Sequence, residues 1–235
     1  MPARPQHARQ RGQPQRGQPQ RSQRQRGQSQ RPLNRDVILE GAIALIEREG
    51  PGALSMRRLG STLGVEAMAI YHHFAGREEL LIALGERLLA PLGALELGES
   101  WRDACRRYGT ALREVAVAQP ATFQLVGLQP LDTSDSLRTV ERLLGVLVAA
   151  GFGPATALAI YRATVSYARG YALAQATGFT VDAAQPAGAK RLAALPQEQF
   201  PILAGRAAEL AELDADAAYA LGLDALLAGV GDPRA

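Results

Sequence analysis

The chain has 235 residues, of which 47% are hydrophobic, with 26 Lys and Arg against 23 Asp and Glu and a single Cys. This composition predicts a globular protein of one or two domains, and one cysteine excludes a disulfide scaffold and a cysteine-based zinc site. Since no apolar stretch reaches the roughly 18 residues that span a bilayer and no secretory signal is visible, we expect a soluble, cytoplasmic protein without a membrane partner.

The first 31 residues have a charge pattern of their own. They hold eight Arg and no acid, which leaves 18 basic residues against 23 acids in the rest of the chain. Arg recurs every five residues at positions 11, 16, 21, 26 and 31, among Gln, Gly and Pro. A segment with so little apolar surface cannot offset the entropy lost on ordering, so residues 1–31 are predicted to be a disordered tail. It is either a solubilising extension or an arm that binds polyanions without sequence preference.

The sequence from Leu33 onward predicts a first helix. Asn34 is suited to cap its N-terminus, and Leu33 and Ile38 are placed to form a hydrophobic staple across that cap. Residues 50–52, Gly-Pro-Gly, end the helix. The positions that face the core follow helical spacing: Ile38, Ala42, Leu45 and Ile46.

Two short helices and the start of a long one follow. Ser55 is suited to begin the second helix, and Gly64 to end it in the left-handed conformation. A third helix is expected to begin near Glu66. A fourth opens at Gly76 and runs to about residue 92, with Pro91 ending or kinking it. The side chains that the second and third helices bury are expected to be Leu59, Leu63, Ile70 and Phe74.

This arrangement is typical of a helix-turn-helix, in which the second helix of the pair enters the major groove of DNA. Five polar or aromatic residues do not fit the buried faces and should lie on one exposed side: Arg57, Arg58, Tyr71, His72 and Arg77. Without nucleic acid they are ordinary solvated side chains. Residues 33–80 hold five Arg and seven acids, so either these few bases are focused on one face or the Arg-rich tail supplies much of the attraction to phosphate. We predict that the tail makes a real contribution.

Residues 33–95 resemble the DNA-binding end of the tetracycline-repressor (TetR) family. The resemblance lies in "LSMRRLGSTLGVEAMAIYHHFAGREELL" at 54–81, where "YHHF" at 71–74 is the most specific piece. "GESW" at 98–101, "TVERLL" at 139–144, and "FPIL" and "YALGLDALLAGV" within 200–230 are similar to the tetracycline repressor itself. The resemblance implies an all-α fold, with a three-helix helix-turn-helix head at 32–80 and a helical ligand-binding and dimerisation domain at 81–235.

The resemblance also implies a role for individual residues of the head. Arg57 should read a base edge from the second helix, and guanine is the usual target of a guanidinium. Ser55 and Tyr71 should contact phosphate. Arg77, at the start of the fourth helix, occupies the position of a phosphate-binding lysine.

The third helix departs from the family at its base-facing positions, which here hold Ala67, Met68 and Ala69. Apolar side chains can touch thymine methyl groups but cannot form paired hydrogen bonds with a base. The operator should therefore differ from that of the tetracycline repressor. His72 replaces an aromatic residue that is common in the family, and it could hydrogen-bond a base or a phosphate.

The rest of the chain is expected to form helices at 101–118, 120–128, 136–150, 154–176 and 206–229. Wide Ala and Leu arcs on the last two favour burial on two sides, and the resemblance implies that they form the four-helix bundle of a dimer. The two-fold symmetry of such a dimer matches a palindromic operator. Residues 178–201 contain three Pro and are expected to be a long connection, either a lid over a ligand pocket or a floppy linker.

The resemblance implies that a small molecule binds in the core of the second domain. Each candidate contact is equally an ordinary packed or surface residue: Trp101, Tyr108, Phe123, Gln124, Gln129, Tyr161, Tyr167 and Tyr171. The positions through which the tetracycline repressor holds its metal-chelated drug fall at Tyr108, Leu112, Val126 and Leu143, and the second domain contains no His. We therefore expect no cofactor and no metal, no binding of magnesium–tetracycline, and an effector more apolar than tetracycline.

Together these features predict a repressor that binds a palindromic operator as a dimer and is released by a small apolar effector. The fourth helix would link the two sites, and each ligand would weaken the binding of the other. One alternative is a protein that coats nucleic acid through its Arg-rich tail with similar affinity for any sequence. A helical enzyme is a weaker alternative, because the sequence has no Gly-rich phosphate loop, no HExxH motif and no His near Cys105.

Overall fold

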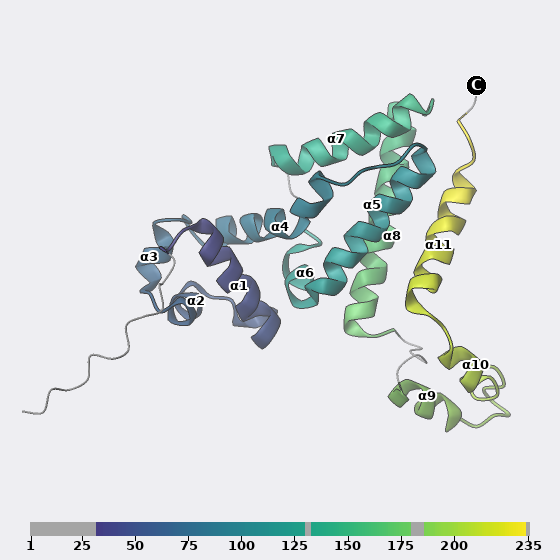
Figure 1. The fold of residues 1–235 in the computed structure, drawn as a ribbon. Coiled ribbons are helices and arrows are strands. Elements are labelled where there is room, and N and C mark those ends of the chain that lie inside the picture. The colour runs from purple at the N-terminus through teal and green to yellow at the C-terminus, as the bar shows by residue number, and fades with distance from the viewer. Residues whose placement is uncertain (1–31, 130–132, 180–185, 234–235) are drawn as a thin grey trace, which may run out of the picture. The chain divides into compact units, whose positions relative to one another are not determined.

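The computed structural model describes residues 32–129, 133–179 and 186–233, so the predicted tail at 1–31 lies outside the described residues. Within these ranges the fold is all-helical (Figure 1). The N-terminal elements are α1 (Arg35–Glu49), the short 3-10 helix η1 (Pro51–Ala53), α2 (Met56–Leu63), α3 (Ala67–Tyr71) and α4 (Arg77–Gly93). No helix that the structure describes combines the length and the hydropathy needed to cross a membrane.

The local signals in the sequence place the first helices correctly. The side chain of Asn34 accepts a hydrogen bond from the Val37 amide at 2.9 Å, and Ser55 accepts one from the Arg58 amide at 3.2 Å. Each bond satisfies an N–H group that the helix itself leaves unpaired. Gly64 ends α2 with a φ of 70°, in the left-handed region that glycine enters without strain. α4 continues two residues past Pro91 before it ends at Gly93.

Seven further helices follow in the described part of the chain. They are α5 (Trp101–Ala118), α6 (Pro120–Val126), α7 (Ser134–Ala149), α8 (Pro154–Thr177), α9 (Pro186–Ala193), α10 (Ala207–Ala211) and α11 (Ala215–Val230). Helices α5, α8 and α11 pack against one another and run side by side in Figure 1. The prediction is therefore confirmed for α5, and for α6, α7 and α8 to within two residues at each end.

Two predictions about the C-terminal region are wrong. Residues 206–229 do not form one helix, because α10 ends at Ala211 and α11 starts anew where Asp214 accepts a hydrogen bond from the Ala217 amide at 2.7 Å. Residues 178–201 are not a connection without regular structure, because they contain α9. Leu192 of α9 is buried against α10 in a small core of its own. Residues 180–185 lie outside the described residues.

A single larger core extends from α1 to α11, and α4 joins the N-terminal helices to the later ones within it. Leu80, Leu84, Leu88 and Leu92 recur every four residues along it and are almost fully buried. Through them and their neighbours α4 packs against α1, α5, α6 and α7. Each buried leucine contributes about 1.5–3 kcal/mol, so the position of α4 depends on both the N-terminal helices and the later ones.

Candidate functional site

The α2–α3 pair is held together by a close approach of two backbones. The Val65 amide donates to the Gly60 carbonyl at 2.9 Å. A methyl group at Gly60 would stand 2.9 Å from the Val65 carbonyl oxygen, closer than side-chain carbons come to such an atom. Glycine at position 60 is therefore needed to bring α3 against α2, a requirement that is not visible from helical spacing alone.

Helix α3 presents one face to its surroundings. Ile70 and Phe74 are buried beneath it, whereas Met68 and Tyr71 are 65% and 44% exposed. His72 is exposed as well, and the two alanines that flank Met68 are half-buried. The side chains that sequence reasoning assigns to base contact thus lie on or beside the accessible face of α3, and none of them is in the core.

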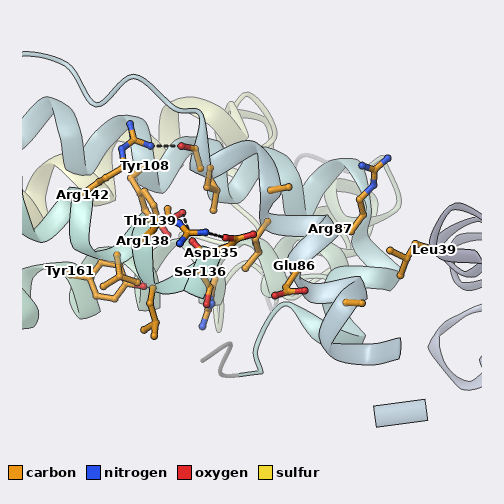
Figure 2. Close-up of a pocket in the computed structure, with 18 of the residues that line it drawn as sticks. Leu39, Glu86, Arg87, Tyr108, Asp135, Ser136, Arg138, Thr139, Arg142 and Tyr161 are labelled. Atoms are coloured by element: carbon orange, nitrogen blue, oxygen red, sulfur yellow. Dashed lines mark hydrogen bonds and ion pairs between the residues drawn. The ribbon is translucent and has the colours of Figure 1, made fainter. Parts of the chain in front are cut away.

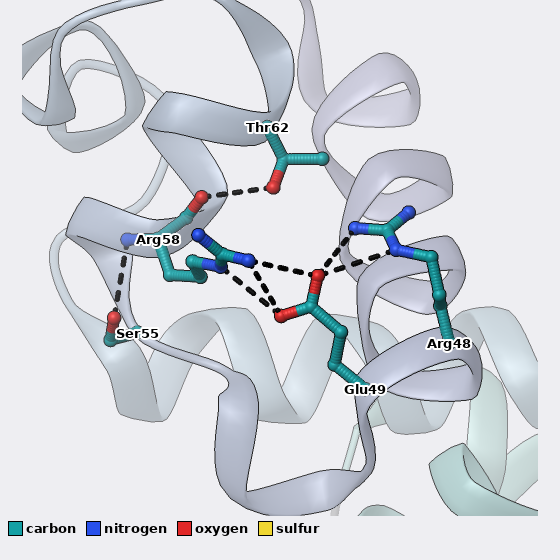
Figure 3. Close-up of polar contacts among 5 residues, drawn as sticks. All are labelled: Arg48, Glu49, Ser55, Arg58 and Thr62. Atoms are coloured by element: carbon teal, nitrogen blue, oxygen red, sulfur yellow. Dashed lines mark hydrogen bonds and ion pairs between the residues drawn. The ribbon is translucent and has the colours of Figure 1, made fainter.

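Glu49, at the end of α1, forms ion pairs with two arginines, Arg48 and Arg58 (Figure 3). It accepts hydrogen bonds from the Arg58 guanidinium at 3.0 and 3.1 Å and from Arg48 Nη2 at 2.9 Å. The hydrogen bond with Arg48, followed by that with Arg58, holds the pKa of Glu49 below its ordinary value. Arg58 is exposed, as predicted, but it is held in an ion pair and shares the single negative charge of Glu49 with Arg48.

Arg35 forms a comparable set of contacts at the turn between α3 and α4. Its guanidinium donates to Glu79 at 2.8 Å and to the His73 carbonyl, and it lies over the Phe74 ring at 4.0 Å. Glu79 also accepts from the Ala75 amide at 2.6 Å, and this bond, followed by that with Arg35, lowers the pKa of Glu79. These contacts fix the turn that joins α3 to α4.

Two arginines of residues 33–80 form no ion pair within the described residues. Arg35, Arg48 and Arg58 are paired, whereas Arg57 and Arg77 form no ion pair within the described residues. Both are exposed, as are the other three side chains predicted to lie off the buried faces. Arg57 stands on α2 and Arg77 begins α4, so the two exposed arginines without an ion pair belong to the helices immediately before and after α3. This pattern suits a phosphate backbone that α3 approaches.

A cavity of about 1050 Å³ lies between α4, α7 and α8, and residues of α1 and α5 complete its lining. Figure 2 shows Tyr108 and Tyr161 at one end and Leu39 and Arg87 at the other. The two tyrosine rings are 6.1 Å apart between centroids. Tyr108 is 6% exposed, and burial, followed by the charge and hydrogen bond of Tyr161, raises its pKa.

Of the predicted ligand contacts, Tyr108 and Tyr161 line this cavity and the others do not. Trp101 is buried against Phe152, with the ring centroids 5.0 Å apart, and Phe123 is 1% exposed in the core. Gln124 and Gln129 are exposed at the surface. The remaining two, Tyr167 and Tyr171, lie between α8 and α11.

These two tyrosines belong to a packing network. The Tyr167 hydroxyl donates to the Tyr219 carbonyl at 3.0 Å, and the Tyr171 hydroxyl donates to the Ala215 carbonyl at 3.1 Å. Arg113 of α5, 5% exposed, lies over the Tyr219 ring and donates to Asp216 at 2.7 Å. The network joins α5, α8 and α11, so its aromatic residues have structural partners already.

Of the four positions that correspond to drug contacts of the tetracycline repressor, one lines the cavity and three lie in the core. Leu112, Val126 and Leu143 are buried in the core and do not line the cavity, whereas Tyr108 does. Among the residues that the structure describes, no three His, Cys, Asp or Glu side chains gather closely enough to hold a metal ion. The expectation that magnesium–tetracycline does not bind stays a prediction.

Two long-range contacts that sequence reasoning missed join later helices to α4 and α1. Arg142 of α7 donates to the carbonyls of Gly93 and Leu95, the latter at 2.7 Å, and so satisfies the carbonyl end of α4. Glu47 of α1 accepts from the Thr122 amide at 2.8 Å and from its hydroxyl at 2.7 Å, at the amino end of α6. Neither pair has a signature in the sequence, because its members are 47 or more residues apart.

Comparison with known proteins agrees with this geometry. Residues 38–84 match the family model "Bacterial regulatory proteins, tetR family", and residues 94–232 match "Tetracyclin repressor-like, C-terminal domain". An HTH-type transcriptional regulator of Saccharopolyspora erythraea is 32% identical over 74% of this chain and 74% of its own. The class D tetracycline repressor protein of Escherichia coli is 27% identical over 84% of this chain and 88% of its own.

Solved structures show the same fold. A possible TetR family transcriptional regulator from Streptomyces coelicolor superposes with a TM-score of 0.72 at 26% identity, covering 84% of this chain and 98% of the other. The S. coelicolor TetR family protein ActR, in complex with actinorhodin, superposes with a TM-score of 0.67 at 26% identity over 85% of this chain and 97% of its own.

Proposed function

The chain belongs to the tetR family of bacterial regulatory proteins, and on that premise we propose that it is a repressor that binds a palindromic operator as a dimer and releases it when an effector binds. The family evidence points to a transcriptional regulator rather than an enzyme. Since operator DNA of a bacterium lies in the cytoplasm, that is where the protein would act.

One observation carries the DNA-binding part of the proposal. The exposed face of α3 is preceded by Arg57 and followed by Arg77, and these are the two arginines of residues 33–80 without an ion pair within the described part of the chain. We propose that Arg57 reads a base and that Arg77 binds phosphate. Ser55 and Tyr71 would contact phosphate as well, while Ala67, Met68, Ala69 and His72 would face the bases.

The dimer would form through α8 and α11. The exposed positions of these helices are rich in small apolar residues, which let helix axes approach closely: Ala155, Ala159 and Gly170 on α8, and Ala217, Ala220, Ala225 and Ala228 on α11. Leu221, in the middle of α11, is 73% exposed. A large side chain so exposed among small apolar ones favours a partner helix at this surface.

The effector would bind in the cavity beside α4 and act on the DNA-binding helices through α4. The proposed division is a head at 32–80 and a ligand-binding and dimerisation domain at 81–235, so α4 belongs to both. A ligand that displaces Arg142 would free the carbonyl end of α4, and α4 would then shift the spacing of the two α3 helices in a dimer. By linkage, operator DNA must then weaken effector binding to the same extent.

Selection of binding sites from random duplex DNA with the full chain tests the proposal. The expected product is one palindrome, because each subunit of a dimer reads the same half-site. A Met68→Glu variant should recover no sequence, since it places a negative charge on the exposed face of α3. The matched control Leu128→Glu changes an exposed side chain beyond α6 and should recover the same palindrome. Recovery of unrelated sequences by the unmodified chain would overturn the proposal.

A further inference from the structure

The cavity between α4, α7 and α8 is rich in arginine. Six arginines and three carboxylates line it. Four of the arginines have partners: Arg35 pairs with Glu79, Arg87 with Glu40, Arg138 with Asp135, and Arg142 with the carbonyls that follow α4. The other two, Arg162 and Arg169, form no ion pair within the described residues, and both belong to α8.

The three carboxylates of the lining are either paired or come from elements at the other end of the cavity. Asp135 is already paired with Arg138. Asp36 belongs to α1, and Figure 2 shows Glu86 on the side of Leu39 and Arg87, away from Tyr108 and Tyr161. A negatively charged ligand would therefore meet no unpaired carboxylate of the lining beside the tyrosines.

One face of α8 contributes an arginine and a tyrosine to the lining of the cavity. Leu158 and Arg169 are eleven residues apart, about three turns of helix, and therefore lie on the same face. Tyr161 is one turn after Leu158, and all three line the cavity. Tyr108 of α5 lies beside Tyr161, with the ring centroids 6.1 Å apart, and the positive charge of Arg169 opposes the rise in the pKa of Tyr108. The guanidinium and the two phenols thus form one cluster.

This cluster has a donor without an acceptor. The Nε atom of Arg169 is buried and has no hydrogen-bond partner within the described residues. Buried donors, charged ones above all, are nearly always satisfied in folded proteins because leaving them unpaired is costly. Burial, followed by the charge and the hydrogen bond of Tyr161, raises the pKa of Tyr108, so its phenol stays protonated near neutral pH and the pair of hydroxyls can offer one proton to a ligand. What the cluster lacks is an acceptor.

We propose that the cluster of Arg169, Tyr108 and Tyr161 binds the carboxylate of an effector whose remaining surface is apolar and ring-bearing. A carboxylate accepts from a guanidinium and from hydroxyls at once. The apolar walls for the rings are Leu89, Leu92, Val140 and Leu158, and a cavity of about 1050 Å³ holds several fused rings. The proposal rests on the proposed function, and an aromatic acid replaces the small apolar effector expected from the sequence.

A pair of fluorescent probes tests this without knowledge of the natural effector. 1-Pyrenebutyrate and the neutral 1-pyrenebutanol share rings and chain length and differ in the carboxylate. Binding of each to the full chain is measured by fluorescence anisotropy at pH 7. The acid should bind at least about tenfold more tightly than the alcohol, the scale of one charge-assisted hydrogen bond. Equal affinity, or no binding of either probe, would contradict the proposal.

Variants then assign the preference to the cluster. Arg169→Met should remove the preference for the acid and leave the affinity for the alcohol within about twofold, and Tyr108→Phe should reduce the preference in part. Arg138→Gln is the matched control, because that arginine lines the same cavity but is paired with Asp135. If Arg169→Met unfolds, Arg169→Lys keeps the charge but not the Nε donor, and it should retain only part of the preference. A full preference in every folded variant would overturn the assignment.

Failure of the carboxylate proposal can be distinguished from failure of the proposed repressor function. Binding of the palindrome by the unmodified chain is measured in the same preparations. Palindrome binding without a preference for the acid would reject the inference alone, and a preference for the acid without a selected palindrome would reject the repressor alone.

Discussion

Glu47 of α1 and Thr122 of α6 form a paired contact in which one carboxylate oxygen accepts both the Thr122 amide and its hydroxyl, at 2.8 and 2.7 Å. The same carboxylate accepts from the Ala121 amide at 3.3 Å. It therefore satisfies the amino end of α6, where the helix dipole favours a negative charge. Through this contact the helix that supports the DNA-binding pair is joined to a helix that also packs against α4.

Removal of this carboxylate should destabilise the whole protein. Glu47→Ala leaves the fully buried Thr122 hydroxyl and its amide without an acceptor, at a cost of about 1–3 kcal/mol. Thermal unfolding should shift downward by about 2–4 °C per kcal/mol at this chain length. The control is Glu114→Ala, an exposed carboxylate on α5, which should change the unfolding temperature little. Equal shifts in the two variants would refute the role of the pair.

The two adjacent arginines of α2 should behave differently toward DNA. Arg57→Ala should weaken binding to the selected operator by about 1–3 kcal/mol and relax the preference at one base pair, as expected for loss of a base contact. Arg58→Ala should change operator affinity by less than about threefold, because Glu49 already holds Arg58. Anisotropy titrations with the operator and its single-base variants give both values. A larger loss from Arg58→Ala than from Arg57→Ala would reverse the assignment.

Most of the helices, and the face that α3 exposes, could be predicted because their signals are local. Asn34, Ser55 and Gly64 act on backbone groups within a few residues of themselves, so a single stretch of sequence contains the evidence. The interruption between α10 and α11 was missed because Asp214 can also continue a helix, and only its capping bond shows that it begins one.

The cavity could not be predicted in the same way. Tyr108 and Tyr161 come from α5 and α8, and their meeting depends on how those helices pack. Tyr167 and Tyr171 are equally plausible ligand contacts by residue type, yet their hydroxyls already donate hydrogen bonds to backbone carbonyls of α11. The pairing of Arg58 with Glu49, and the lack of an acceptor for Arg169, likewise depend on three-dimensional neighbours.

The contacts of Glu79 at the turn between α3 and α4 should make the free energy of unfolding depend on pH. The pKa of Glu79 is lowered in the folded protein, first by the Ala75 amide and then by Arg35, so its contribution is present above the ordinary value of 4.5 and is lost as the pH falls through the lower folded value. Glu79→Gln should therefore be less stable than the unmodified chain at pH 7, and the difference should shrink below pH 4.5. Urea unfolding of both proteins at pH 7 and again below pH 4.5 measures this difference in the free energy of unfolding. A difference that is independent of pH would show that the ionised carboxylate is not responsible.

The proposed dimer surface can be tested at one side chain. Leu221→Asp places a charge in the middle of α11 and should convert the dimer to monomers in sedimentation velocity, with loss of operator affinity. Leu213→Asp changes a leucine that is also strongly exposed, 60% against 73%, but precedes α11, and it should leave the dimer intact. A dimer that persists in Leu221→Asp would move the interface elsewhere.

The proposed function requires that the two DNA-binding heads of a dimer bind matching half-sites at a fixed separation. The most direct measurement compares the affinity of the full chain for the selected palindrome with its affinity for the same palindrome carrying five extra base pairs between the half-sites. Five base pairs are about half a helical turn, so the second half-site would face away from the second head. The predicted result is a loss of affinity of about 100-fold or more. Equal affinity for the two duplexes would contradict the account.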